Sequence, residues 1–207
     1  MIDEGTIKFV SHWTESPPLD LPEIAGLLTW RKPLFAAALI GHDQAHDVGY
    51  GNLSARIGDT GQFVISGSQT GHISCPGARH FARVTEARIE ANTVVSTGPV
   101  EASSESLTHA AIYALEPAIR AVVHVHSPDL WAGLKDTLPA TRNGIAYGTP
   151  PMAFEFARLY AETAFADDGI ARMAGHEGGL ISFGNSVQHA AERILALMTD
   201  QAIGKRG

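Results

Sequence analysis

The sequence predicts an α/β fold in three layers, α/β/α, with a central β-sheet flanked by helices. Two observations lead to this prediction. Segments with the composition and alternation of strands are interleaved along the chain with segments of helical spacing. Of the 207 residues, 44% are hydrophobic and 18% are charged, which is the range of ordinary globular domains with a sizeable core. Interleaved elements of this kind pack best with helices on both faces of one sheet.

The first 20 residues are predicted to form an N-terminal arm or edge strand, set apart from a domain over residues 21–207. Polar and apolar side chains alternate along residues 6–13, which is typical of a strand. Pro17 and Pro18 are expected to end this strand, because proline cannot donate a ladder hydrogen bond.

The rest of the chain is expected to alternate between helices, turns and strands. In chain order the prediction gives a helix at 21–40 with a break or kink at Pro33, a turn at 49–54, strands at 53–57 and 63–65 around a turn at 58–61, a turn at 67–71, a β-branched strand at 93–96, a helix at 105–115, a strand at 121–126, a helix at 154–165, a strand at 179–183 and a helix at 186–198. The order and direction of the strands stay open at this level.

Charge and cysteine content narrow the class of protein. The formal net charge of −7 argues against a nucleic-acid partner, since no basic stripe is available to neutralise phosphates. The single cysteine, Cys75, permits neither an intramolecular disulfide nor a cysteine zinc ribbon, and it predicts a reducing, cytoplasmic location. The apolar stretches are far shorter than a membrane span, so no membrane partner is expected. A small anionic substrate is compatible with this charge, because backbone N–H groups can bind it.

Two histidines in the predicted strand 121–126 are the strongest chemical signal. Successive strand side chains point to opposite faces, so His124 and His126 project together while the intervening valines point into the core. Two imidazoles at this spacing can bind one metal ion at about 2.0–2.1 Å. Pro128 ends the strand, which predicts that the pair lies at a sheet edge beside a cleft. The alternative is two histidines on a half-exposed strand that hydrogen-bond to their neighbours.

His176 is the best candidate for a third ligand, because a catalytic zinc typically has three protein ligands and one open position. It lies in the glycine-rich turn Gly175-His176-Glu177-Gly178-Gly179, directly before an apolar strand, where the backbone can approach a site closely. Taken alone, a histidine in such a turn is more often a surface-loop residue.

Glu105 is predicted in the first turn of the helix 105–115, which Ser103 and Ser104 introduce as N-cap residues. A carboxylate there can bind the metal or act as the acid/base beside it. The helix start, with two hydroxyls and free N–H groups, also suits an anion. Simple capping is the alternative, since serine followed by glutamate is common at helix starts.

Two further turns offer hydrogen-bond donors for phosphate oxygens. They are Gly51-Asn52-Leu53-Ser54 and Ser66-Gly67-Ser68, each next to a predicted strand. Either would be an ordinary turn on its own.

The order of these motifs resembles the class II aldolase/adducin family, and within it the fuculose-phosphate aldolase-like members. The resemblance covers roughly residues 34–198, and residues 105–128 are its most specific part. It rests on Gly51-Asn52-Leu53-Ser54, Ile65-Ser66-Gly67, Ser103-Ser104-Glu105, His124-Val125-His126-Ser127-Pro128 and His176, in this order.

The resemblance implies a metal ion held by His124, His126 and His176, with Glu105 as the acid/base residue. Zinc is the expected metal, with manganese, cobalt or iron as alternatives, because imidazole ligands suit several cations. The resemblance also implies a central sheet between helix layers and a homotetramer with its sites between subunits. The positions implied to bind substrate phosphate are Asn52, Ser66, Gly67, Ser103 and Ser104.

The chain departs from the family pattern at three places. The usual Asn-His-Gly at the third ligand is replaced by Gly175-His176-Glu177, and the usual phosphate turn is altered to Ile65-Ser66-Gly67-Ser68. The stretch 131–150, which often supplies a tyrosine proton donor to the neighbouring subunit, is shorter than usual. Tyr147 is the one tyrosine there, and it is given little weight.

Other histidines carry weaker signals. His42 and His46 have the spacing of a zincin pair, but the glutamate that serves as general base between such histidines is missing, so a pair on a helix end or loop is expected. His109 follows Glu105 by one helical turn and could support it. A hydrogen-bonded histidine on a helix face is the more common case.

The resemblance implies a metal-dependent aldehyde-lyase of the aldolase type, acting on a small hydroxylated carbonyl compound that is expected to be a sugar phosphate. The metal would polarise the carbonyl and hydroxyl oxygens of the substrate and stabilise an enediolate, while Glu105 moves protons. Two alternatives remain: a pentulose-phosphate 4-epimerase or ketose-phosphate dehydratase on the same scaffold, and a non-catalytic, adducin-like interaction module. The family's epimerases tend to carry aspartate where Glu105 stands, and adducin-type heads lack the histidine set.

Overall fold

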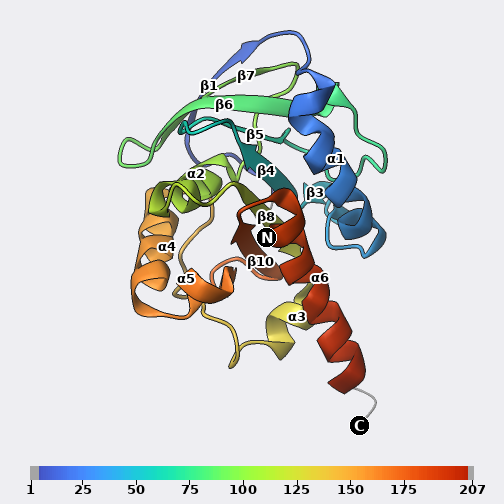
Figure 1. The fold of residues 1–207 in the computed structure, drawn as a ribbon, viewed down its shortest axis with the longest axis vertical. Coiled ribbons are helices and arrows are strands. Elements are labelled where there is room, and N and C mark those ends of the chain that lie inside the picture. The colour runs from blue at the N-terminus through green and yellow to red at the C-terminus, as the bar shows by residue number, and fades with distance from the viewer. Residues whose placement is uncertain (1–4, 205–207) are drawn as a thin grey trace.

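The computed structural model describes residues 5–204. Residues 1–4 of the predicted N-terminal arm and residues 205–207 of the predicted domain lie outside the described residues. Figure 1 shows helices on both sides of a central sheet. In chain order the elements are β1 (Val10–Glu15), α1 (Leu21–Ala36), β2 (Gly41–Asp43), β3 (Val48–Tyr50), β4 (Asn52–Arg56), β5 (Phe63–Ser66), the short 3-10 helix η1 (Ala78–His80), β6 (Phe81–Arg88), β7 (Thr93–Gly98), α2 (Ser106–Leu115), β8 (Ala121–His126), α3 (Pro128–Gly133), α4 (Pro150–Glu162), α5 (Phe165–Asp168), β9 (Ile170–Arg172), β10 (Gly179–Gly184) and α6 (Val187–Gly204).

The central sheet has eight strands in the order β1-β7-β6-β5-β4-β8-β10-β9, and β2 and β3 form a separate hairpin. β1 pairs with β7 in parallel, whereas the other neighbours are antiparallel. β8 ends at His126, so the histidine pair lies where the strand ends beside a cleft, as predicted. β8 is an interior strand, with Asn52 of β4 opposite His124 and Gly179 of β10 opposite His126. Pro128 does end the strand, because it begins α3 with Ser127 as the N-cap.

Two hydrophobic cores, one on each face of the sheet, confirm the predicted three layers. One core gathers residues of α2, α4 and α5 against the sheet, and the other gathers residues of α1, α3 and α6. β8 contributes to both: Val122 lies in the first core, while Val123 and Val125 lie in the second. This confirms that the valines next to His124 point away from it, as strand alternation requires. Burial of each such side chain stabilises the fold by about 1.5–3 kcal/mol.

The structure moves several predicted boundaries. The first strand lies at Val10–Glu15 rather than 6–13, where its backbone pairs with β7. The helix predicted at 21–40 contains Pro33 but ends at Ala36. The turn predicted at 49–54 is the junction of β3 and β4, with Gly51 at φ +75° between them.

The prediction missed β6, the strand Phe81–Arg88. Its charged side chains hide the apolar alternation, and a β-bulge between Val84 and Glu86 shifts that alternation by one residue. A pattern with a period of two therefore does not persist along this strand. Among residues 5–204, no helix is both long and apolar enough to cross a membrane.

A buried polar network joins α2 to the sheet. His109 Nδ1 lies 2.7 Å from Ser54 Oγ, and the same hydroxyl lies 2.7 Å from the Tyr113 hydroxyl. All of these side chains except Tyr113, which is 4% exposed, are fully buried. His109 thus faces Ser54 of β4, which agrees with the expectation of a hydrogen-bonded histidine on a helix face.

Acid is expected to destabilise the fold through His109. Burial lowers the pKa of His109 to about 3, whereas an unfolded histidine has a pKa of about 6.5. Below pH 6.5 the unfolded chain therefore binds a proton that the folded chain excludes, so stability falls as the pH falls from 6.5 toward 3, by up to about 1.4 kcal/mol per pH unit. Urea unfolding at pH 7.0 and pH 5.5 measures this loss. In His109→Gln the loss between the two pH values should be smaller by about 1 kcal/mol, and an equal loss would contradict the assignment.

Candidate metal centre

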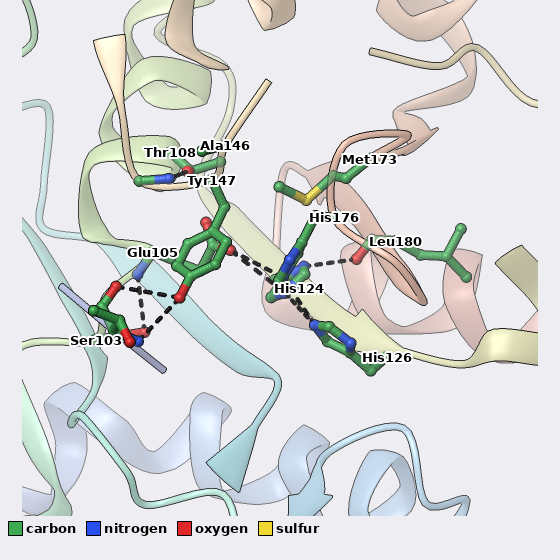
Figure 2. A network of polar contacts seen from close by, with 12 residues as sticks. Ser103, Glu105, Thr108, His124, His126, Ala146, Tyr147, Met173, His176 and Leu180 are labelled. Carbon is green, nitrogen blue, oxygen red and sulfur yellow. Dashed lines mark hydrogen bonds and ion pairs between the residues drawn. The ribbon is translucent and has the colours of Figure 1, made fainter. Parts of the chain in front are cut away.

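Three imidazoles converge at the end of β8. The Nε2 atoms of His124 and His126 lie 3.1 Å apart, and the Nε2 atoms of His126 and His176 lie 3.0 Å apart. A tetrahedral zinc site with bonds of about 2.0–2.1 Å places its nitrogens about 3.4 Å apart, so small ring shifts admit one cation. Within residues 5–204, this is the only group of three or more His, Cys, Asp or Glu side chains placed to hold a metal ion. The predicted trio is therefore brought together (Figure 2).

Neighbouring groups orient these rings. His124 is fully buried, and its Nδ1 lies 3.1 Å from the backbone carbonyl of Leu180 on β10. An N–H donated to this carbonyl leaves the lone pair at Nε2, the nitrogen that faces the other two rings. His176 is held by its backbone, which donates to Met173 and accepts from Gly179. This tight turn returns the chain from β9 to β10 and brings His176 over the strand pair.

Glu105 lies beside the trio, fully buried. Its Oε1 is 3.5 Å from His176 Nε2 and 3.7 Å from His124 Nε2. The prediction that the two serines cap the helix is wrong, because Glu105 itself is the N-cap and α2 begins at Ser106. Ser103 instead shapes the turn before the helix: its Oγ accepts from the Glu105 N–H, and its carbonyl accepts from Ser106. This turn directs the Glu105 carboxylate toward the imidazoles (Figure 2).

A small recess collects most of the residues predicted to bind phosphate. Asn52, Gly67, Ser103 and Ser104 line it, whereas Ser66 does not. The Ser66 hydroxyl instead accepts from the Leu53 N–H at 3.3 Å and so joins β5 to β4. The recess has a volume of about 10 Å³; its other lining residues are Gly5, Gly49, Gly51, Ser68, Gln69, Thr70 and Gly71.

Comparison of the sequence with family models gives one match. The sequence model of the family described as Class II Aldolase and Adducin N-terminal domain matches residues 34–200. The chain belongs to this family. The expected resemblance is thus confirmed, and residues 34–200 include every predicted site residue.

Solved structures of class II aldolase proteins share the fold. An L-fuculose-1-phosphate aldolase from Thermus thermophilus superposes with a TM-score of 0.64 at 21% identity, over 89% of this chain and 93% of that one. YgbL from Klebsiella pneumoniae, described as a putative aldolase/epimerase/decarboxylase, gives a TM-score of 0.63 at 22% identity, over 90% of each chain. A sugar-phosphate aldolase from Thermotoga maritima gives 0.65 at 14% identity, over 89% of this chain and 94% of that one. At these identities the likeness is one of fold.

A large cleft opens over the histidine trio of this class II aldolase family member. Its volume is about 810 Å³, which is large enough for a small-molecule substrate. His126 and His176 lie in its wall, so a ligand in the cleft can reach the candidate metal position. The other lining residues are His42, Asp43, Gln44, Ala45, Val48 and Tyr50 of the β2–β3 region, with Pro128, Ala146, Tyr147, Gly175 and Glu177.

The hairpin formed by β2 and β3 was not predicted, and it explains two histidines. His42 Nε2 lies 3.1 Å from Asp47 Oδ1, and His46 Nδ1 lies 2.8 Å from Asp43 Oδ2. Both histidines thus pair within the hairpin instead of forming a zincin helix. His46 lies in the turn of the hairpin, as expected for a loop residue, whereas His42 lies in the strand β2.

Tyr147 belongs to the site despite the little weight given to it from the sequence. Its ring centroid lies 4.4 Å from that of His176, and it is 2% exposed. Its hydroxyl accepts from the backbone N–H of Thr6 at 3.0 Å, and Lys8 Nζ lies 3.2 Å from its ring centroid. Neither Thr6 nor Lys8 carries a sequence signal that points to the site. No local pattern links residues 141 positions apart, so only the folded chain reveals this contact.

Gly179 leaves the space that two of the imidazoles occupy. A Cβ atom at this position would lie 2.7 Å from His176 Cδ2 and 3.3 Å from His124 Cε1. Gly178 before it has φ +79°, a conformation that favours glycine. The glycine pair therefore allows β10 to begin directly beside the trio.

Gly179→Ala is expected to lower the affinity for the metal by about 10–100-fold, the range seen when the support of metal ligands is lost. The added methyl group would displace the His176 ring from the position in which its Nε2 faces His126. Competition with a chelator of known affinity measures the effect. Gly61→Ala is the matched control, because a Cβ at Gly61 meets nothing within 4 Å among the described residues. Equal affinity in both variants would show that the trio does not need this space.

Proposed function

We propose that this protein is a metal-dependent aldehyde-lyase of the class II aldolase type. It would cleave or form a carbon–carbon bond in a small hydroxylated carbonyl compound, expected to be a sugar phosphate. The observation that carries the proposal is the convergence of three imidazole nitrogens, with Nε2 distances of 3.0 and 3.1 Å, beside the buried Glu105 carboxylate. An adducin-like interaction module has no need of such a site at the base of a cleft.

The donor set fits a divalent cation. Three imidazole ligands would leave a fourth position open for substrate, and zinc is the proposed metal. His124, His126 and His176 would hold it, and it would supply Lewis acidity toward the oxygen atoms of the substrate. Because His124 is fixed by Leu180 and His176 by its own turn, little reorganisation is needed on binding.

Glu105 is the proposed acid/base residue. Its carboxylate lies within 4 Å of two of the proposed ligands, and the fully buried position keeps water away from it. A substrate bound through its oxygens at the trio would present its neighbouring C–H or O–H proton near Glu105. The carboxylate can take up this proton from the substrate and return it to the product.

The recess is the proposed position of the substrate phosphate. Asn52, Ser103 and Ser104 would provide donors, and Gly67 would line the position without donating, because its own N–H already donates to the His80 carbonyl at 2.8 Å. Ser66 would hold the two strands together behind them. The remainder of the substrate would lie in the cleft, over the trio.

Location and assembly are also proposals. The one cysteine, Cys75, is exposed and supports a reducing, cytoplasmic setting. A homotetramer is expected, and the apolar side chains of Val10, Trp13 and Leu21, which are 40–64% exposed, are candidates for subunit contacts. Light scattering on a sizing column measures the mass in solution.

Elemental analysis followed by product analysis tests the proposed function. The purified protein should hold about one divalent cation per chain, as a three-histidine site predicts. It should split a ketose phosphate from a panel of sugar phosphates into two carbonyl fragments. An epimer or a dehydrated product would favour the alternative enzymes on this scaffold. A chain that neither binds divalent cations nor turns over any sugar phosphate would contradict the proposal.

A further inference from the structure

The side chain of Gln69 bridges two residues that line the recess proposed to bind the substrate phosphate. Its Oε1 accepts a hydrogen bond from the Gly49 N–H at 3.0 Å, and its Nε2 donates to the Gly5 carbonyl at 3.3 Å. The remaining space, about 10 Å³, is close to the volume that holds one water molecule. The recess therefore contains a side-chain oxygen that accepts from one of its backbone N–H groups.

The backbone at Gln69 suggests that this residue is present for its side chain. Its φ is +57°, in the left-handed region that glycine adopts at lower cost. The neighbouring backbone is fixed, since Thr70 Oγ1 donates to the Gly67 carbonyl at 2.8 Å. Gln69 is nevertheless exposed to solvent, so its carboxamide can swing outward without leaving a buried cavity.

A buried cation lies next to the same loop. Arg31 of α1 is 2% exposed, and its Nη2 donates to the carbonyls of Thr70 and Gly71 at 3.1 and 3.0 Å. Its Nη1 is buried with no hydrogen-bond partner among the described residues. Desolvation lowers the pKa of Arg31 to about 10, so it stays charged at neutral pH. The described residues that line the recess include neither Lys nor Arg, so Arg31 is a source of positive charge beside it.

We propose that the Gln69 carboxamide holds the place of an anionic group of the substrate, which displaces it on binding. This inference rests on the proposed function, because it assigns the displaced position to the phosphate of that substrate. A phosphate oxygen would replace Gln69 Oε1 as the acceptor of the Gly49 N–H. Arg31, which donates to the carbonyls of Thr70 and Gly71, would favour the negative charge of the phosphate through its own positive charge. A neutral hydroxyl group gains no such charge interaction, so an anionic group displaces Gln69 more readily than a neutral one.

Calorimetric titration of the metal-loaded full chain with inorganic phosphate tests the proposal. Gln69→Ala should bind phosphate about fivefold more tightly than the unaltered chain, because one or two weak hydrogen bonds no longer have to be broken. Gln69→Glu should bind it at least about tenfold more weakly, because a like charge then occupies the recess. Gln188→Glu is the matched control: it makes the same change at an exposed position of α6 and should leave phosphate binding unaltered.

Two results would overturn the proposal. Weaker binding by Gln69→Ala would mean that Gln69 donates to the anion instead of vacating its position. Equal phosphate affinity in both Gln69 variants and the unaltered chain would mean that the recess is not the anion site. The lack of phosphate binding in all of these proteins would mean the same. Metal content and sugar-phosphate cleavage are measured on the same preparations, so that a failure of this inference can be distinguished from a failure of the proposed function. A metal-loaded, active chain with unresponsive Gln69 variants refutes this inference alone.

Discussion

His126→Ala is expected to abolish tight metal binding and, with it, turnover. The Nε2 of His126 lies 3.1 Å from that of His124 and 3.0 Å from that of His176, so its removal leaves only two of the three proposed ligands. The loss of affinity should exceed the roughly 100-fold that follows removal of an outer-shell partner of a metal ligand. Because His126 is only half-buried, the fold should remain intact.

Elemental analysis after dialysis, together with titration of zinc into the apoprotein, measures this effect. His12→Ala is the control, since His12 is exposed on β1 and belongs to no cluster of possible ligands among the described residues. Its metal content should match that of the unaltered chain. If His126→Ala retained one tightly bound cation per chain, the assignment of the ligands would be refuted.

The sequence predicted the part of the site that depends on local geometry. His124 and His126 share a face because they are two residues apart in one strand, and this rule holds wherever the strand lies in the sheet. The position of β8 within the sheet was not predictable in the same way. Pro128 marks the end of a strand, but it carries no information on the neighbours of that strand, and β4 and β10 lie on either side.

The residues that were missed reach the site from distant parts of the chain. Thr6 and Lys8 contact Tyr147 across about 140 positions, and no alternation or spacing records such a contact. Gln69 was part of a predicted glycine-rich turn, but the direction of its side chain depends on Gly49 and Gly5. His176 was found through the family resemblance and its glycine-rich turn, since the chain brings it to His126 from 50 positions away.

Glu105→Gln is expected to lower kcat by about 100- to 10,000-fold, which is the usual contribution of a positioned acid or base. The amide has nearly the same shape as the carboxylate, so α2 should still begin after residue 105 and the imidazoles should stay in place. It cannot take up a proton, however, so the side chain that lies within 4 Å of two of the imidazoles would no longer act as a base. Metal binding should persist, because three imidazoles complete a catalytic zinc site without a carboxylate.

Three measurements on one preparation separate these effects: metal content, turnover of the cleaved sugar phosphate, and exchange of the substrate C–H proton with deuterated solvent. Retained metal with lost exchange is the expected result, and it distinguishes an acid/base residue from a fourth ligand, whose loss would lower the metal content as well. Glu192→Gln, at an exposed position of α6, makes the same chemical change far from the trio in sequence and should leave all three unaltered. Unchanged turnover in Glu105→Gln would remove the carboxylate from the mechanism, and the three imidazoles would then have to act with a base from elsewhere in the cleft.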